Sequence, residues 1–103
     1  MKETALPRCL QEPYANFTKN RQDAFSNERL SVHLTKCGVK ELFIGGVYAE
    51  ACVTATTRTA LRRGFDVTVL TDAVGSTTEH ARERACTRLA RLGAKLATIE
   101  SAL

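Results

Sequence analysis

The chain has 103 residues and a formal net charge of +4, with 15 Lys and Arg against 11 Asp and Glu. Apolar residues make up 44% and charged residues 25%, which excludes a disordered chain, a collagen-like repeat and a disulfide-dense miniprotein. No segment approaches the roughly 20 apolar residues of a membrane span, so we expect one folded domain that binds no membrane.

The first 26 residues lack the regular pattern of the rest. They contain Pro7 and Pro13 and no apolar run of normal strand length. We therefore interpret residues 1–26 as an extended arm and residues 27–103 as the folded domain.

Three helices are predicted after the arm. They are expected at residues 27–37, 50–63 and 78–92, and each is followed by a glycine that ends it. Ser76, with Glu79 three residues later, matches a capping box that opens the third helix.

Three strands alternate with these helices, at residues 41–47, 66–71 and 95–99. This order describes two consecutive βαβ units, which cross over right-handedly and lay their strands parallel. The predicted fold class is therefore α/β, with a three-layer α-β-α architecture. Ligands of such sheets bind at the carboxyl ends of the strands, so the chemistry is expected just after Val47 and Thr71.

Cys52 follows the first predicted strand and lies in the first turn of the next helix. Unpaired backbone N–H groups and the positive end of the helix dipole favour a thiolate there, which makes Cys52 a candidate nucleophile. The alternative is a small buried apolar residue, as free cysteines commonly are. The four cysteines contain no CxxC pair, so we predict neither a metal site nor a disulfide framework.

Arginines cluster between residues 82 and 91, where glutamates are interleaved with them. Few aromatic residues accompany the cluster, and no nucleic-acid-binding motif is present. We interpret the cluster as a solvated helix face and expect no nucleic-acid partner.

Four blocks of the sequence resemble the isochorismatase-like cysteine hydrolases. They occur in the family's order between residues 19 and 103, as KNRQDAFSNERL, GGVYAEACV, VTVLTDAVGS and LARLGAKLATIE. The resemblance implies a Rossmann-like sheet of which this chain holds the C-terminal half, without the first strands.

The resemblance also implies roles for individual residues. Cys52 corresponds to the nucleophile, which attacks the carbonyl carbon of an amide-like substrate, and Lys19 to the lysine that stabilises the thiolate. A non-proline cis peptide is implied between Val47 and Tyr48. The backbone N–H groups of Tyr48 and Cys52 then form an oxyanion hole for the tetrahedral intermediate. No cofactor and no metal are expected.

The general base is the main departure from the family pattern. The family takes an aspartate from the end of a first strand upstream of the lysine, but only 18 residues precede Lys19 and none is predicted to form that strand. Asp23 and Glu50 are the nearby carboxylates that are candidates to replace this aspartate as the general base. Alternatively, Asp23 pairs with Lys19, and Glu50 favours the helix N-terminus.

The sequence therefore predicts an amidase-type cysteine hydrolase that cleaves a small amide, ureide or related C–N bond through a thioester on Cys52. Loss of the general base is expected to impair it. The alternative is a non-catalytic remnant that binds a small ligand or forms a subunit interface, so the sequence leaves enzyme activity undecided. We expect a small-molecule substrate, a homo-oligomer and a cytoplasmic location.

Overall fold

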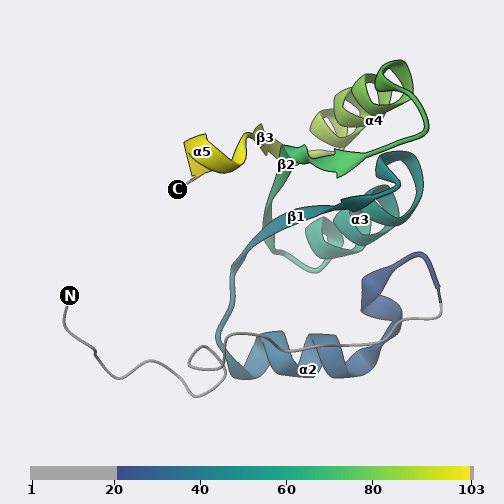
Figure 1. Ribbon diagram of the computed structural model, residues 1–103. Helices are drawn as coiled ribbons and strands as arrows, with labels where there is room; N and C mark the ends of the chain where they lie inside the picture. The colour runs from purple at the N-terminus through teal and green to yellow at the C-terminus, as the bar shows by residue number, and fades with distance from the viewer. Residues whose placement is uncertain (1–20, 103) are drawn as a thin grey trace.

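The computed structural model describes residues 21–102, which form a three-stranded sheet with helices (Figure 1). All neighbouring strands are parallel, and their order is β1-β2-β3. The strands are β1 (Glu41–Val47), β2 (Asp66–Gly75) and β3 (Lys95–Ala97). The helical elements are η1 (Ala24–Ser26), α2 (Glu28–Lys36), η2 (Ala49–Val53), α3 (Thr54–Arg62), α4 (Glu79–Leu92) and α5 (Ile99–Ala102). The predicted α/β class, built from parallel βαβ units, is confirmed.

One face of the sheet packs against α3 and α4 and holds the core. Val67 and Val69 of β2 lie on this face, with exposed fractions of 2% and 0%. Leu89 of α4 and Ala60 of α3 are fully buried. The alternation of apolar side chains along β2 therefore directs one set of residues under the helices, as expected for a strand with one covered face.

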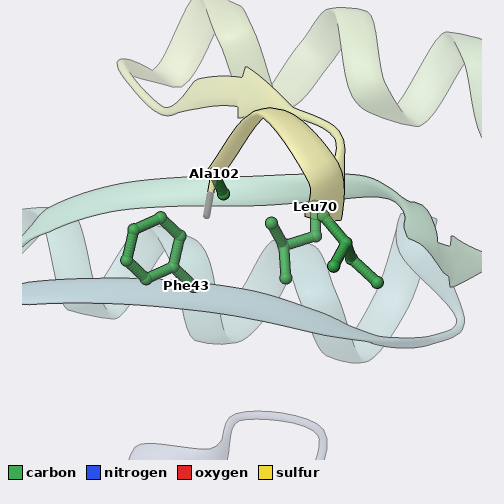
Figure 2. Close-up of a pocket in the computed structure, with 4 residues that line it drawn as sticks. Phe43, Leu70 and Ala102 are labelled. Carbon is green, nitrogen blue, oxygen red and sulfur yellow. The ribbon is translucent and has the colours of Figure 1, made fainter. Parts of the chain in front are cut away.

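The other face of the sheet carries Phe43 of β1 and Leu70 of β2. Within residues 21–102, α5 is the helix that lies on this face, where Ile99 and Ala102 border a hollow beside the two strands (Figure 2). Of the second helical layer that the sequence predicts, the described residues 21–102 show the four-residue helix α5 on this face.

The middle strand is longer than predicted, because residues 72–75 continue β2 rather than forming a loop. The parallel register shifts between Ile44 and Gly46, and pairing then resumes between Gly46 and Val74. Extra residues in β2 thus form a bulge, and the strand stays paired to the end of β1.

The start of α4 differs from the predicted capping box. Thr78 is the N-cap residue, and its hydroxyl accepts a hydrogen bond from the Ala81 N–H at 3.0 Å. The Ser76 hydroxyl instead donates to Glu50. The prediction of Ser76 as the cap is wrong, because a partner distant in sequence competes for its hydroxyl.

Part of the predicted arm packs on the folded domain. Phe25 of η1 is 4% exposed, and its ring lies 5.9 Å from that of Phe65, with the Arg63 guanidinium 5.1 Å from its centroid. The Ala24 N–H donates to the Thr56 hydroxyl at 2.9 Å. The division of the chain at residue 26 stays a prediction, but Phe25 belongs to the core.

The described cysteines differ in state. Cys52 and Cys86 carry thiols, whereas Cys37, at the C-terminus of α2, is disulfide-bonded. The sequence predicts no disulfide framework, because cysteine spacing alone does not reveal which residues a fold brings together. No helix among residues 21–102 is long and apolar enough to cross a membrane.

Candidate functional site

Cys52 belongs to η2, the turn that joins β1 to α3. The strand ends at Val47, the peptide bond between Val47 and Tyr48 is cis, and the π-helical turn η2 follows. In η2 the Tyr48 carbonyl accepts hydrogen bonds from the N–H groups of Ala51 and Val53 at 3.1 and 3.2 Å. Single π-helical turns of this kind occur frequently at functional sites.

Packing and one side-chain hydrogen bond hold the turn in place. Ala49 and Val53 are 0% and 3% exposed, which fixes both ends of η2 in the core. The Thr54 hydroxyl donates to the Ala49 carbonyl at 2.6 Å. The small side chain of Ala49 allows η2 to pack closely on the sheet, and Cys52 is presented from this fixed turn.

A hollow of about 210 Å³ opens beside Cys52. Cys52 is partly exposed there, in contrast to Cys86, which is buried in the core. The hollow is bordered by the end of β1, by η1 and by the start of α3, through Ala24, Ile44, Gly45, Gly46, Val47, Cys52, Val53 and Thr56. Its size suits a small molecule or a small side chain.

Glu50, two residues before Cys52, is tied to the end of β2. Its carboxylate accepts a hydrogen bond from the Ser76 hydroxyl at 2.6 Å. This bond lowers the pKa of Glu50, with further lowering by its own backbone N–H and by the charge of Arg84. Glu50 is therefore an ionised anchor of the turn at neutral pH.

Asp23, the second carboxylate considered as a substitute base, has both oxygens engaged. One accepts a hydrogen bond from the Phe25 N–H at 2.9 Å, and the other accepts one from the Thr59 hydroxyl. Asp23 therefore caps η1 and fastens it to α3.

The structure brings together part of the predicted site. Val47 and Cys52 border the same hollow, and Tyr48, the residue after Val47, is 49% exposed. Lys19 lies outside the described residues, so its position relative to Cys52 stays a prediction. No group of His, Cys, Asp and Glu suited to a metal ion occurs within residues 21–102.

Two contributors to the site are not predicted from the sequence. Thr56 borders the hollow and binds Ala24, and its position four residues after Cys52 is the signal that places both on one helix face. The sequence predicts Ser76 as a helix cap, and no local pattern reveals its hydrogen bond to Glu50.

The isochorismatase domain family model matches residues 5–101 of this chain. The probable hydrolase YcaC of Escherichia coli is 41% identical over 76 residues, which cover 74% of this chain and 36% of that protein. Nicotinamidase 3 of Arabidopsis thaliana is 39% identical over 72 residues, covering 70% of this chain and 36% of that protein.

Two solved structures also match the fold of this chain. The E. coli YcaC structure, described as an octameric hydrolase of unknown specificity, matches with a TM-score of 0.72 and 37% identity over 79% of this chain and 40% of that one. YcaC from Pseudomonas aeruginosa, solved with covalent acrylamide, matches with a TM-score of 0.75 and 36% identity over 81% of this chain and 41% of that one.

The fold and these matches define one class of protein, the chains with an isochorismatase-like α/β fold. The chain belongs to the isochorismatase family. It spans 36% of the length of the two curated relatives described above.

Proposed function

We propose that the chain is a cysteine hydrolase module that cleaves a small amide, ureide or related C–N bond through a thioester on Cys52. The observation that carries the proposal is the placement of Cys52, partly exposed beside a hollow of about 210 Å³, on a fixed turn at the carboxyl end of β1. This is the edge of a parallel sheet at which ligands bind.

The reaction proceeds in two steps. The Cys52 thiol loses its proton and the thiolate attacks the carbonyl carbon, so that a C–S bond forms. The C–N bond then breaks as the leaving nitrogen takes up the proton that the thiol has lost. Water then attacks the thioester, which releases the carboxylic acid and restores the thiol. The N–H groups of Tyr48 and Cys52 stabilise the oxyanion, and Lys19 stabilises the thiolate.

The proton transfers in this reaction have no assigned general base among the described residues. Asp23 and Glu50 both accept hydrogen bonds that fasten structural elements, so neither is assigned as the general base. General acid–base catalysis contributes about 10²- to 10⁴-fold in rate, and we expect turnover to be reduced on that scale.

The relatives support amide chemistry at a reactive nucleophile. One is a nicotinamidase, whose substrate is an amide, and the P. aeruginosa YcaC structure holds covalent acrylamide. This chain spans 36% of that nicotinamidase and 41% of that YcaC chain, so we propose amide chemistry for it by similarity.

A non-catalytic remnant is the second candidate. The engagement of Asp23 and Glu50 favours it, because a hydrolase of this type needs a proton acceptor. In this case the same hollow binds a small ligand without cleaving it.

Product analysis over a panel of small amides and ureides distinguishes the two. We expect slow release of ammonia or amine that is abolished by Cys52→Ala and retained by Cys86→Ala, since Cys86 is buried in the core. Lys19→Ala is expected to lower the rate. Absence of turnover across the panel would leave the remnant, and release that survives Cys52→Ala would exclude the thioester mechanism.

We also propose homo-oligomeric assembly and a cytoplasmic location. The octameric state of E. coli YcaC supports the first, and the need for a reduced Cys52 thiol supports the second. The disulfide at Cys37 is evidence against the cytoplasmic location, because disulfides persist mainly in oxidising compartments. Cell fractionation, with the redox state of Cys37 read by mass spectrometry, decides the location.

A further inference from the structure

The short turn η1 forms one wall of the hollow beside Cys52. Ala24 of η1 borders this hollow, and the rest of the border belongs to β1, η2 and α3. Those three elements are held by the fold itself, because β1 pairs with β2 and η2 runs directly into α3. η1 has only three residues, so its position depends on the side chains that contact it.

Two threonines of α3 bind η1. Thr56 and Thr59 are three positions apart, which places them on one side of the helix. The Thr56 hydroxyl accepts a hydrogen bond from the Ala24 N–H at 2.9 Å, and the Thr59 hydroxyl donates one to the Asp23 carboxylate. Both bonds join segments more than 30 positions apart in sequence.

Ala24 lies between two anchored neighbours. On one side, Phe25 is 4% exposed and belongs to the core. On the other side, one oxygen of Asp23 accepts the Phe25 N–H at 2.9 Å and the other accepts the Thr59 hydroxyl. Hydrogen bonds to a carboxylate are stronger than those between neutral groups. The bond between Asp23 and Thr59 therefore fixes the start of η1, and with it Ala24.

We propose that Asp23 and Thr59 are positioning residues for the reaction of Cys52. Their hydrogen bond holds Ala24 in the wall of the hollow and so limits the size of the group that reaches the sulfur. The preferred substrates are then amides and ureides whose group beside the sulfur is compact. The inference rests on the proposed function of Cys52, and it adds a size limit and the residues that set it.

Alkylation of Cys52 by two reagents of different size tests the proposal. Iodoacetamide is the small reagent, and an iodoacetamide with a naphthyl group on its nitrogen is the large one. The rate for the large reagent is divided by the rate for the small one, in the folded and in the urea-unfolded chain. We expect this ratio to be lower in the folded wild-type chain than in the unfolded chain.

Thr59→Val removes the hydroxyl and keeps the shape of the side chain. Thr59 does not border the hollow, so an effect of this variant on Cys52 has to act through η1. We expect the ratio in the folded chain to rise by about tenfold, the change in population that loss of one hydrogen bond to a carboxylate allows. Asp23→Ser, which keeps a helix cap but is too short to reach Thr59, is expected to raise the ratio as well.

Three controls accompany these variants. Thr59→Ser keeps the hydroxyl and is expected to retain the wild-type ratio. Thr87→Val is the matched control, because the Thr87 hydroxyl donates to the Glu83 carbonyl within α4, and its ratio is expected to be unchanged. Slow labelling of Cys86, which is buried in the core, verifies that each variant is folded.

An unchanged ratio in both Thr59→Val and Asp23→Ser overturns the proposal, as does a wild-type ratio that is equal in the folded and unfolded chains. Amide turnover by the wild-type chain is measured separately. Turnover together with an unchanged ratio removes the size limit and keeps the thioester mechanism. A ratio that shifts as expected without any turnover keeps the role of Asp23 and Thr59 at the hollow and removes the hydrolase.

Discussion

The carboxylate of Glu50 accepts a hydrogen bond of 2.6 Å from the hydroxyl of Ser76, across 26 positions of sequence. Glu50 belongs to η2, the turn that presents Cys52, and Ser76 directly follows β2. The bond therefore ties the cysteine turn to the end of the middle strand.

Ser76→Ala is expected to lower the free energy of unfolding at neutral pH, with Ser76→Thr, which keeps the hydroxyl, close to wild type. The bond lowers the pKa of Glu50 in the folded state, so its stabilisation is present above the ordinary carboxyl pKa. It is lost as the pH falls through the lowered pKa of the folded state. Urea titrations at neutral and acidic pH check this, and a difference between wild type and Ser76→Ala that persists in acid would be contrary to it.

Phe25→Ala is expected to lower the free energy of unfolding by about 3 kcal/mol, because a buried aromatic ring is lost from the core. Phe25 is 4% exposed and packs against Phe65. Val32→Ala, at an exposed position of α2, is expected to change stability by no more than about 0.5 kcal/mol. Urea denaturation measures both, and equal effects of the two variants would refute the docking of η1 on the core.

Thr57→Val is expected to raise the free energy of unfolding by about 1 kcal/mol. The Thr57 side chain is fully buried, and its hydroxyl has no hydrogen-bond partner in the part of the chain that the structure describes. Replacing an unsatisfied hydroxyl by a methyl group of similar size removes a desolvation cost.

Thr54→Val is the contrasting variant, because the Thr54 hydroxyl donates to the Ala49 carbonyl. It is expected to lower the free energy of unfolding by about 1–2 kcal/mol. Thermal unfolding compares the melting temperatures of the two variants with that of the wild type. Melting temperatures that shift in the same direction in both variants contradict the distinction between an unpaired Thr57 hydroxyl and a paired Thr54 hydroxyl.

The sequence predicts the α/β class because each element carries its own local signal. Val67 and Val69 alternate with Asp66 and Thr68, and a glycine follows the end of each of the helices α2, α3 and α4. The extension of β2 to Gly75 carries no such signal, because it depends on pairing with Gly46 and Val47 after a bulge.

The sequence predicts where the candidate site lies but not which partners its carboxylates bind. Its position after Val47 follows from strand order and from the family resemblance. The partners of Asp23 and Glu50 do not, because Thr59 and Ser76 are 36 and 26 residues away and only the folded chain brings them together. A carboxylate suited to catalysis and one that fastens a turn look alike in sequence.

The rate of Cys52 alkylation by iodoacetamide at neutral pH, read by peptide mass spectrometry, tests the proposed nucleophile most directly. We predict that Cys52 reacts faster in the folded chain than in the urea-unfolded chain, although folding partly covers it. Cys86, buried in the core, is predicted to react more slowly when folded. Slower reaction of Cys52 in the folded chain would mean that the turn after β1 shields the sulfur instead of activating it, which contradicts its role as the nucleophile.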